Sequence, residues 1–176
     1  MKKIIYLTLF AAIVSYSSVQ QKIYLNAKAN VGETAWAKDV DRQAKRNEAV
    51  FVKKGEWKCN IFVYEIILAS GYDIGTPDKR NVNCLAHPIL CIKGKNKRPY
   101  VCEDWYNNEV PGFDFIGEGD EGKKKCKPGD IITNGSHIGI IAGNDKTISA
   151  GEDKVVEGDW GYRGDEGNLK IFRYSN

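Results

Sequence analysis

The sequence has only two histidines, His87 and His137, and almost no net charge. The formal net charge is +3, and it falls to about +1 when Lys2 and Lys3 are removed with the N-terminal leader described below. A charge balance this even gives a nucleic acid or another polyanion no overall attraction to the chain. Internal repeats are also missing, so we expect the 176 residues to form one domain that is long enough to bury its own core.

The chain also lacks an apolar run long enough for a membrane helix. Residues 1–20 contain two lysines, an apolar run over residues 4–14 and small or polar residues over 15–18. This is the layout of a secretory signal peptide, and its apolar run is well short of the roughly 20 residues that span a bilayer. We predict a signal peptide over residues 1–20, cleaved between Tyr16 and Gln21, and no stable membrane span. The mature protein, residues 21–176, is expected to be extracellular, or periplasmic if it is bacterial.

Five cysteines are an odd number for a secreted chain. Four of them lie in a turn-rich segment over residues 72–129, and they are Cys84, Cys91, Cys102 and Cys126. Because a secreted protein meets oxidising surroundings, we predict two disulfides among these four, with three connectivities open, and Cys59 as the free thiol. The alternative is a zinc site made of Cys84, His87, Cys91 and Cys102. Their spacing is irregular for a zinc module, so we predict no metal and no other cofactor.

Hydrophobic patterns predict helices in the first part of the mature chain and strands in the last. Residues 59–70 are apolar on most sides and end before Gly71, which indicates a buried helix, and a weaker amphipathic pattern suggests another helix over 34–50. The Asn134-Gly135 pair between two apolar runs indicates a hairpin, and Asp130 is expected to bracket it. Strands are predicted over residues 130–133, 136–142, 146–150, 154–157 and 169–174. This order gives an α+β fold in which the buried helix packs on an antiparallel sheet.

Cys59 and His137 have the properties of a nucleophile and its general base. Cys59 begins the buried helix, where free N–H groups and the helix dipole lower the pKa of a thiol. His137 begins a predicted strand, and an imidazole there can activate the thiol. The other histidine, His87, precedes Pro88 in the cysteine-rich segment and is expected to be structural or at the surface.

Three blocks of sequence resemble the NlpC-type and CHAP amidases, which are papain-like cysteine peptidases of bacterial cell walls. The blocks are residues 57–63 (WKCNIFV), 127–131 (KPGDI) and 136–140 (SHIGI), in the order that the family has them. The Lys-Cys-Asn-x-Phe-Val form of the first block is closest to the amidase effectors of type VI secretion and their domesticated, secreted eukaryotic relatives. The resemblance implies a papain-like NlpC-type fold, with a core helix that carries the nucleophile.

The resemblance also implies a role for particular residues. Cys59 matches the nucleophile, His137 the base and Ser149 the third polar position, where the family more often has histidine, asparagine or glutamine. Because a serine orients an imidazole less firmly, Asp153 or Glu157 is an alternative for that position. Apart from the resemblance, Trp57 and Asn60 flank the nucleophile and are expected to contact the substrate, with core packing as the alternative for Trp57. Trp105 is a further substrate contact that we expect from the aromatic composition of its segment.

By this resemblance, the expected function is that of a secreted, antibacterial cysteine amidase that acts on peptidoglycan as a monomer and uses no cofactor. An immunity protein is expected as a partner if the enzyme is an interbacterial toxin. The alternatives are a wall-binding module without activity and a transamidase or acyltransferase that uses the same Cys59–His137 pair. Residues 134–136 form a glycosylation sequon, and we predict that Asn134 is unmodified because a glycan there would obstruct the base.

Overall fold

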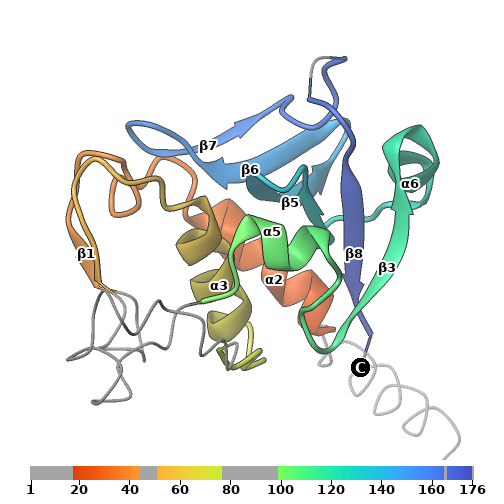
Figure 1. Ribbon diagram of the computed structural model, residues 1–176, viewed down its shortest axis with the longest axis horizontal. Helices are drawn as coiled ribbons and strands as arrows, with labels where there is room; N and C mark the ends of the chain where they lie inside the picture. Colours follow the sequence, from red (N-terminus) through yellow and green to blue (C-terminus); the bar gives the residue numbers. More distant parts are fainter. Residues whose placement is uncertain (1–17, 44–50, 77–98, 165, 176) are drawn as a thin grey trace, which may run out of the picture.

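The computed structural model describes residues 18–43, 51–76, 99–164 and 166–175 (Figure 1). None of the described helices is long and apolar enough to cross a membrane. The elements run in the order α2 (Val19–Ala29), β1 (Arg42–Gln43), β2 (Phe51–Val52), α3 (Cys59–Ala69), α5 (Cys102–Tyr106), β3 (Phe113–Glu118), α6 (Gly119–Lys125), β4 (Ile131–Thr133), β5 (Ile138–Gly143), β6 (Lys146–Ala150), β7 (Val155–Gly158) and β8 (Lys170–Tyr174).

A six-stranded antiparallel sheet forms the frame of the molecule, with strand order β3-β8-β4-β5-β6-β7. The helices α2 and α3 lie against one face of this sheet and contact β5 (Figure 1). All five predicted strands are present within one or two residues of their predicted bounds. The α+β class is therefore confirmed.

Helix α3 is the centre of the main core, as predicted. Ile61, Phe62, Ile66 and Ile67 are buried on different sides of the helix, because α2 covers one side of it and β5 and β6 another. Each such side chain stabilises the fold by about 1.5–3 kcal/mol relative to an exposed one. The helix stops where Gly71 adopts a φ of 95°, a left-handed conformation that favours glycine.

The predicted helix over residues 34–50 is wrong for its described part. Residues 34–41 form turns, and Arg42 belongs to the short strand β1, which pairs with β2. The buried carboxylate of Glu65 on α3 explains this conformation, because it accepts hydrogen bonds from the Trp36 indole and the Arg42 guanidinium. The guanidinium also stacks over the Trp36 ring, 4.2 Å from its centroid. Pairing a buried carboxylate outweighs the weak helical preference of this segment.

Helix α2 was not predicted. Its N-cap is Ser18, whose hydroxyl accepts the Gln21 N–H at 3.2 Å, and it buries Ile23 and Ala27 against the core. The predicted signal peptide, residues 1–20, overlaps this cap and the first residues of the helix. Residues 1–17 lie outside the described part, so the signal peptide stays a prediction.

The segment over residues 72–129 contains regular structure where a stapled loop was predicted. Strand β3 pairs with β8 at one edge of the sheet, and α6 packs against both strands. The pairing is irregular between Phe115 and Gly117, which hides the alternation that marks a strand in a sequence. Cys102 and Cys126 are free thiols in the structure, so they are not bonded to each other. Cys84, His87 and Cys91 lie outside the described residues, so a Cys84–Cys91 disulfide stays a prediction, whereas the structure contains no disulfide through Cys102 or Cys126.

Candidate active site

Cys59 is the first residue of α3, and its side chain is buried at the point where the helix meets β5. Lys58, the N-cap, offers no side-chain oxygen to the first N–H groups of the helix, and the first turn contains no acidic residue. These N–H groups and the helix dipole therefore act on the Cys59 sulfur without a competing carboxylate.

His137 is held by the turn that joins β4 to β5. The backbone N–H of His137 donates to Oδ1 of Asn134 at 2.8 Å, and its carbonyl accepts from the Thr133 hydroxyl at 2.7 Å. Nδ2 of Asn134 in turn donates to the carbonyl of Glu166 at 3.1 Å. The turn thus fixes the backbone on both sides of the imidazole.

The structure brings Cys59 and His137 together, although 78 positions separate them in sequence. The pKa of the Cys59 thiol is lowered to about 5. The largest cause is a hydrogen bond from the Cys102 thiol. Burial of the thiol opposes this effect and raises the pKa. A hydrogen bond from His137, the charge of His137 and a hydrogen bond from the Ile138 N–H lower the pKa further. The lowered pKa favours the thiolate, the form in which a cysteine is a nucleophile.

Cys102 is the neighbour that the sequence did not reveal. It begins α5, and its Sγ lies 3.8 Å from Sγ of Cys59, with both side chains buried. The pKa of Cys102 is raised by its hydrogen bond to Cys59 and by burial, so Cys102 stays protonated beside the Cys59 thiolate. No local pattern could have placed these residues together, because they lie on different helices.

Trp160 is a second neighbour that sequence reasoning missed. Its indole meets the His137 imidazole edge to face, with the ring centroids 4.5 Å apart. The carbonyl of Trp160 accepts the Thr147 hydroxyl at 2.9 Å, which ties this loop to β6. The indole ring therefore packs against the imidazole and limits its rotation.

Ser149 lies on the strand expected for the third polar residue. Ser149 is buried on β6. A Cβ atom built onto Gly139 of β5 would lie 3.3 Å from the Cβ atom of Ser149, so these two residues are cross-strand neighbours. Side chains two residues apart share a face of a strand, which places Ser149 diagonal to His137. No hydrogen bond joins the Ser149 hydroxyl to His137 among the described residues. Ser149 is thus on the expected face, and its role stays a prediction.

The two acidic alternatives lie elsewhere. Glu157 forms an ion pair with Lys28 of α2, on the helical side of the sheet. Asp153 is exposed in the turn between β6 and β7. Neither carboxylate contacts His137, so the described structure does not favour them as orienting groups.

The predicted substrate contacts have different environments. Trp57 is 53% exposed two residues before the nucleophile, and Asn60 is half-buried in the first turn of α3. Trp105 is only 1% exposed and packs edge to face on Phe113 and Phe172. A side chain buried this deeply has no surface left for a substrate, so we assign Trp105 to the core.

Lys58 holds the loops in front of the nucleophile. Its side chain is 1% exposed, and its ammonium group donates hydrogen bonds to four backbone carbonyls. These are the carbonyls of Ala37, Lys38, Lys53 and Glu56, at 3.0, 3.1, 3.4 and 2.9 Å. Burial lowers the pKa of Lys58. The residue therefore ties residues 37–38 and 53–56 to the start of α3.

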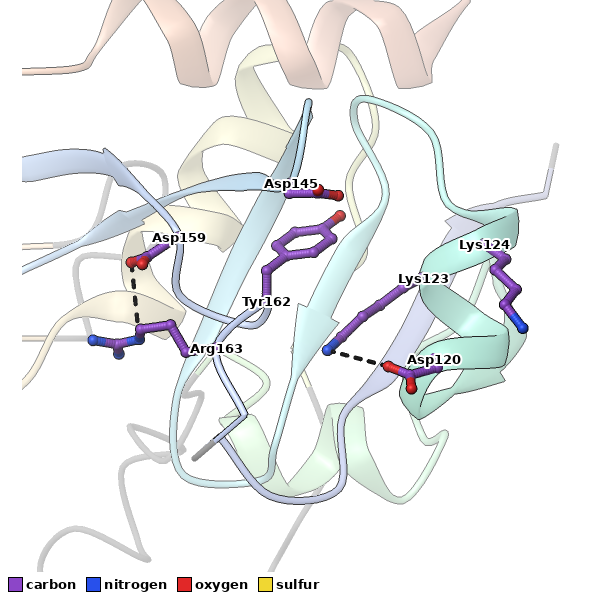
Figure 2. Close-up of a pocket in the computed structure, with 7 residues that line it drawn as sticks. All are labelled: Asp120, Lys123, Lys124, Asp145, Asp159, Tyr162 and Arg163. Atoms are coloured by element: carbon purple, nitrogen blue, oxygen red, sulfur yellow. Dashed lines mark ion pairs between the residues drawn. The ribbon is translucent and has the colours of Figure 1, made fainter.

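Two surface hollows lie apart from this pair of residues. The first, of about 520 Å³, is lined by Asp120, Lys123, Lys124, Asp145, Asp159, Tyr162 and Arg163 (Figure 2). Figure 2 shows Lys123 turned toward Asp120 and Arg163 toward Asp159, at 3.7 and 3.8 Å. The second, of about 720 Å³, borders Phe115 and Lys170. Neither is lined by Cys59 or His137.

The chain matches no family model, no curated protein and no solved structure. Within the described residues, no group of three or more histidine, cysteine or acidic side chains is placed to hold a metal ion.

Proposed function

We propose that this protein is a secreted cysteine amidase that cleaves peptide bonds in bacterial peptidoglycan, with a papain-like NlpC-type fold. The observation that carries the proposal is the thiol of Cys59, with its pKa lowered to about 5, at the start of a buried helix and beside His137. A cysteine kept only for packing has no need of a neighbouring imidazole or of a lowered pKa.

The geometry supports acyl transfer through a thioester. The Cys59 thiolate attacks the carbonyl carbon of the scissile bond, and His137 delivers the proton to the departing amine. Water, activated by the same imidazole, then hydrolyses the thioester and restores the thiol. The backbone N–H of Cys59 has no partner within α3 and is available to the oxyanion of the tetrahedral intermediate.

Peptidoglycan is the proposed substrate because three sequence blocks resemble wall amidases. An exposed surface beside the nucleophile is compatible with it: the Lys38 ammonium lies 4.7 Å from the centre of the Trp57 ring. An aromatic face with an ammonium group suits a peptide stem that bears carboxylates. The Lys38 ammonium also forms an ion pair with the Glu152 carboxylate at 3.9 Å. This carboxylate offsets the charge of Lys38, so the surface is not strongly basic.

The test is digestion of purified Gram-negative and Gram-positive sacculi by the mature protein and by Cys59→Ala, with the released muropeptides identified by mass spectrometry. The proposal requires loss of a stem or cross-link bond with the wild type alone, which also names the bond. Unchanged muropeptides from a folded preparation with a free Cys59 thiol would contradict it. An added amine acceptor tests the transamidase alternative, because a transfer product would replace the hydrolysed one.

A further inference from the structure

The pair formed by Cys59 and Cys102 is the feature of the site that amide hydrolysis does not require. The Cys102 thiol helps to lower the pKa of Cys59, but acyl transfer by a thiol with a base and an oxyanion site does not need a second thiol. Cys102 belongs to α5, which contacts β4 and packs Trp105 into the core, so its position is fixed by the fold. The two sulfur atoms lie 3.8 Å apart.

We propose that Cys59 and Cys102 are a modification site at which a reversible disulfide forms under oxidising conditions and removes the nucleophile. The sulfur atoms need to approach by about 1.8 Å, from 3.8 Å to the bonded length of about 2.05 Å. The movement that the proposal requires is a rotation about the side-chain torsions of the two cysteines, whose sulfur atoms are already neighbours. Neither sulfur has to leave the core.

The chemistry is a thiol–disulfide exchange with a low-molecular-weight disulfide, RSSR, as oxidant. The Cys59 thiolate attacks RSSR, a mixed disulfide with Cys59 forms, and one RS⁻ departs. Cys102 then attacks the Cys59 sulfur, the protein disulfide forms, and the second RS⁻ departs. The two protein thiols lose two electrons and two protons, and RSSR is reduced to two RSH. A reducing thiol reverses both steps.

The lowered pKa of Cys59 favours the first step, because the thiolate is the attacking species. Once Cys59 is part of a mixed disulfide, its negative charge is gone, and that charge contributes to the raised pKa of Cys102. Formation of the mixed disulfide thereby makes Cys102 easier to ionise for the second step. The exchange does not depend on any substrate, whereas its effect on hydrolysis rests on the proposed function.

The experiment uses the full secreted chain, equilibrated with mixtures of reduced and oxidised glutathione, alkylated and digested with trypsin without reduction. Trypsin places Cys59, Cys102 and Cys126 on separate peptides and leaves only Cys84 and Cys91 together. We expect a peptide that links Cys59 to Cys102, which increases with oxidised glutathione and is lost on reduction. Wall hydrolysis should be lost and regained in parallel.

Two variants sharpen the result. In Cys102→Ala, oxidised glutathione should leave glutathione on Cys59, whereas Cys126→Ala, the matched control, should form the same linked peptide as the wild type. Cys102→Ser replaces Cys102→Ala if the latter does not fold. The proposal is overturned if oxidised wild-type protein links Cys102 to Cys84, Cys91 or Cys126, or if Cys59 stays open to alkylation at every glutathione ratio. A linked peptide in a protein that cleaves no wall bond supports the disulfide and contradicts the proposed function.

Discussion

The indole of Trp160 stands edge to face against the imidazole of His137, with 4.5 Å between the ring centroids. We predict that Trp160→Leu lowers kcat/KM for wall peptides by about 10- to 100-fold, because a small displacement of a catalytic group has a cost of this order. The measurement is the rate of muropeptide release. Phe115→Leu, at an exposed ring on β3, is the control and should keep the wild-type rate. Equal rates for Trp160→Leu and the wild type would show that the indole does not position the base.

The reactivity of Cys59 should follow its lowered pKa. We expect the rate of Cys59 alkylation by iodoacetamide to rise through about pH 5, well below the range of an ordinary cysteine. His137→Ala and Cys102→Ala should each move this rise to higher pH, because each removes a hydrogen bond to the thiolate. A wild-type rate that increases only above about pH 8 would refute the assignment of a thiolate.

The same pKa has a consequence for stability. The folded chain releases the Cys59 proton more readily than the unfolded chain does, so the thiolate contributes stability at pH values above the unfolded pKa. This contribution should fall as the pH is lowered and should be lost near pH 5. Urea denaturation of the reduced wild type and of Cys59→Ala over this pH range would measure it. The difference between their free energies of unfolding should change with pH in that direction.

Lys58→Met should destabilise the protein while preserving the length of the side chain. The substitution leaves four carbonyls without the ammonium group, and we expect the free energy of unfolding to fall by about 3 kcal/mol. Chemical denaturation of the reduced protein provides the measurement. Lys54→Met, at an exposed neighbouring lysine, is the matched control and should change stability by less than about 0.5 kcal/mol. Similar losses for both variants would contradict the role assigned to Lys58.

Asn134 should remain unmodified when the protein is secreted from a eukaryotic cell. Its Nδ2 donates to the Glu166 carbonyl, and its Oδ1 accepts the His137 N–H, so a glycan on this amide would disturb the turn that holds the base. Intact mass spectrometry of the active secreted protein should show no glycan. Finding a glycan at Asn134 in a fully active preparation would refute this prediction.

We predict that cleavage of the proposed signal peptide leaves an N-terminus before Val19. Ser18 caps α2, and the Gln20 amide donates at 2.7 Å to Asp130, a buried carboxylate that also binds Arg173. A chain that begins at Lys22 should lose about 2 kcal/mol of stability relative to one that begins at Ser17, because both interactions are removed. Thermal unfolding of the two chains provides the measurement. Equal midpoints would show that the cap and the Gln20 contact are dispensable.

Asp130 illustrates how far local sequence carries a prediction. Asp130 was expected to bracket the Asn134-Gly135 hairpin, whereas its carboxylate accepts the Lys127 N–H at 2.7 Å and so closes the turn that precedes β4. Its further partners, Gln20 and Arg173, come from distant parts of the chain and were not predictable. The same division holds for Trp105, whose neighbours Phe113 and Phe172 show it to be a core residue.

Elements whose signals are local could be predicted from the sequence alone. The continuous apolar run of α3, the Asn-Gly hairpin and the alternating strands depend on neighbouring residues, and each is found where it was predicted. The sequence also identified Cys59 and His137 as candidates, because their residue types and their positions at element starts are local properties. Only the tertiary structure decided which side chains surround them. Cys102 and Trp160 reach the site through the packing of α5 and of the loop after β7, since long-range packing brings together residues that no sequence spacing relates.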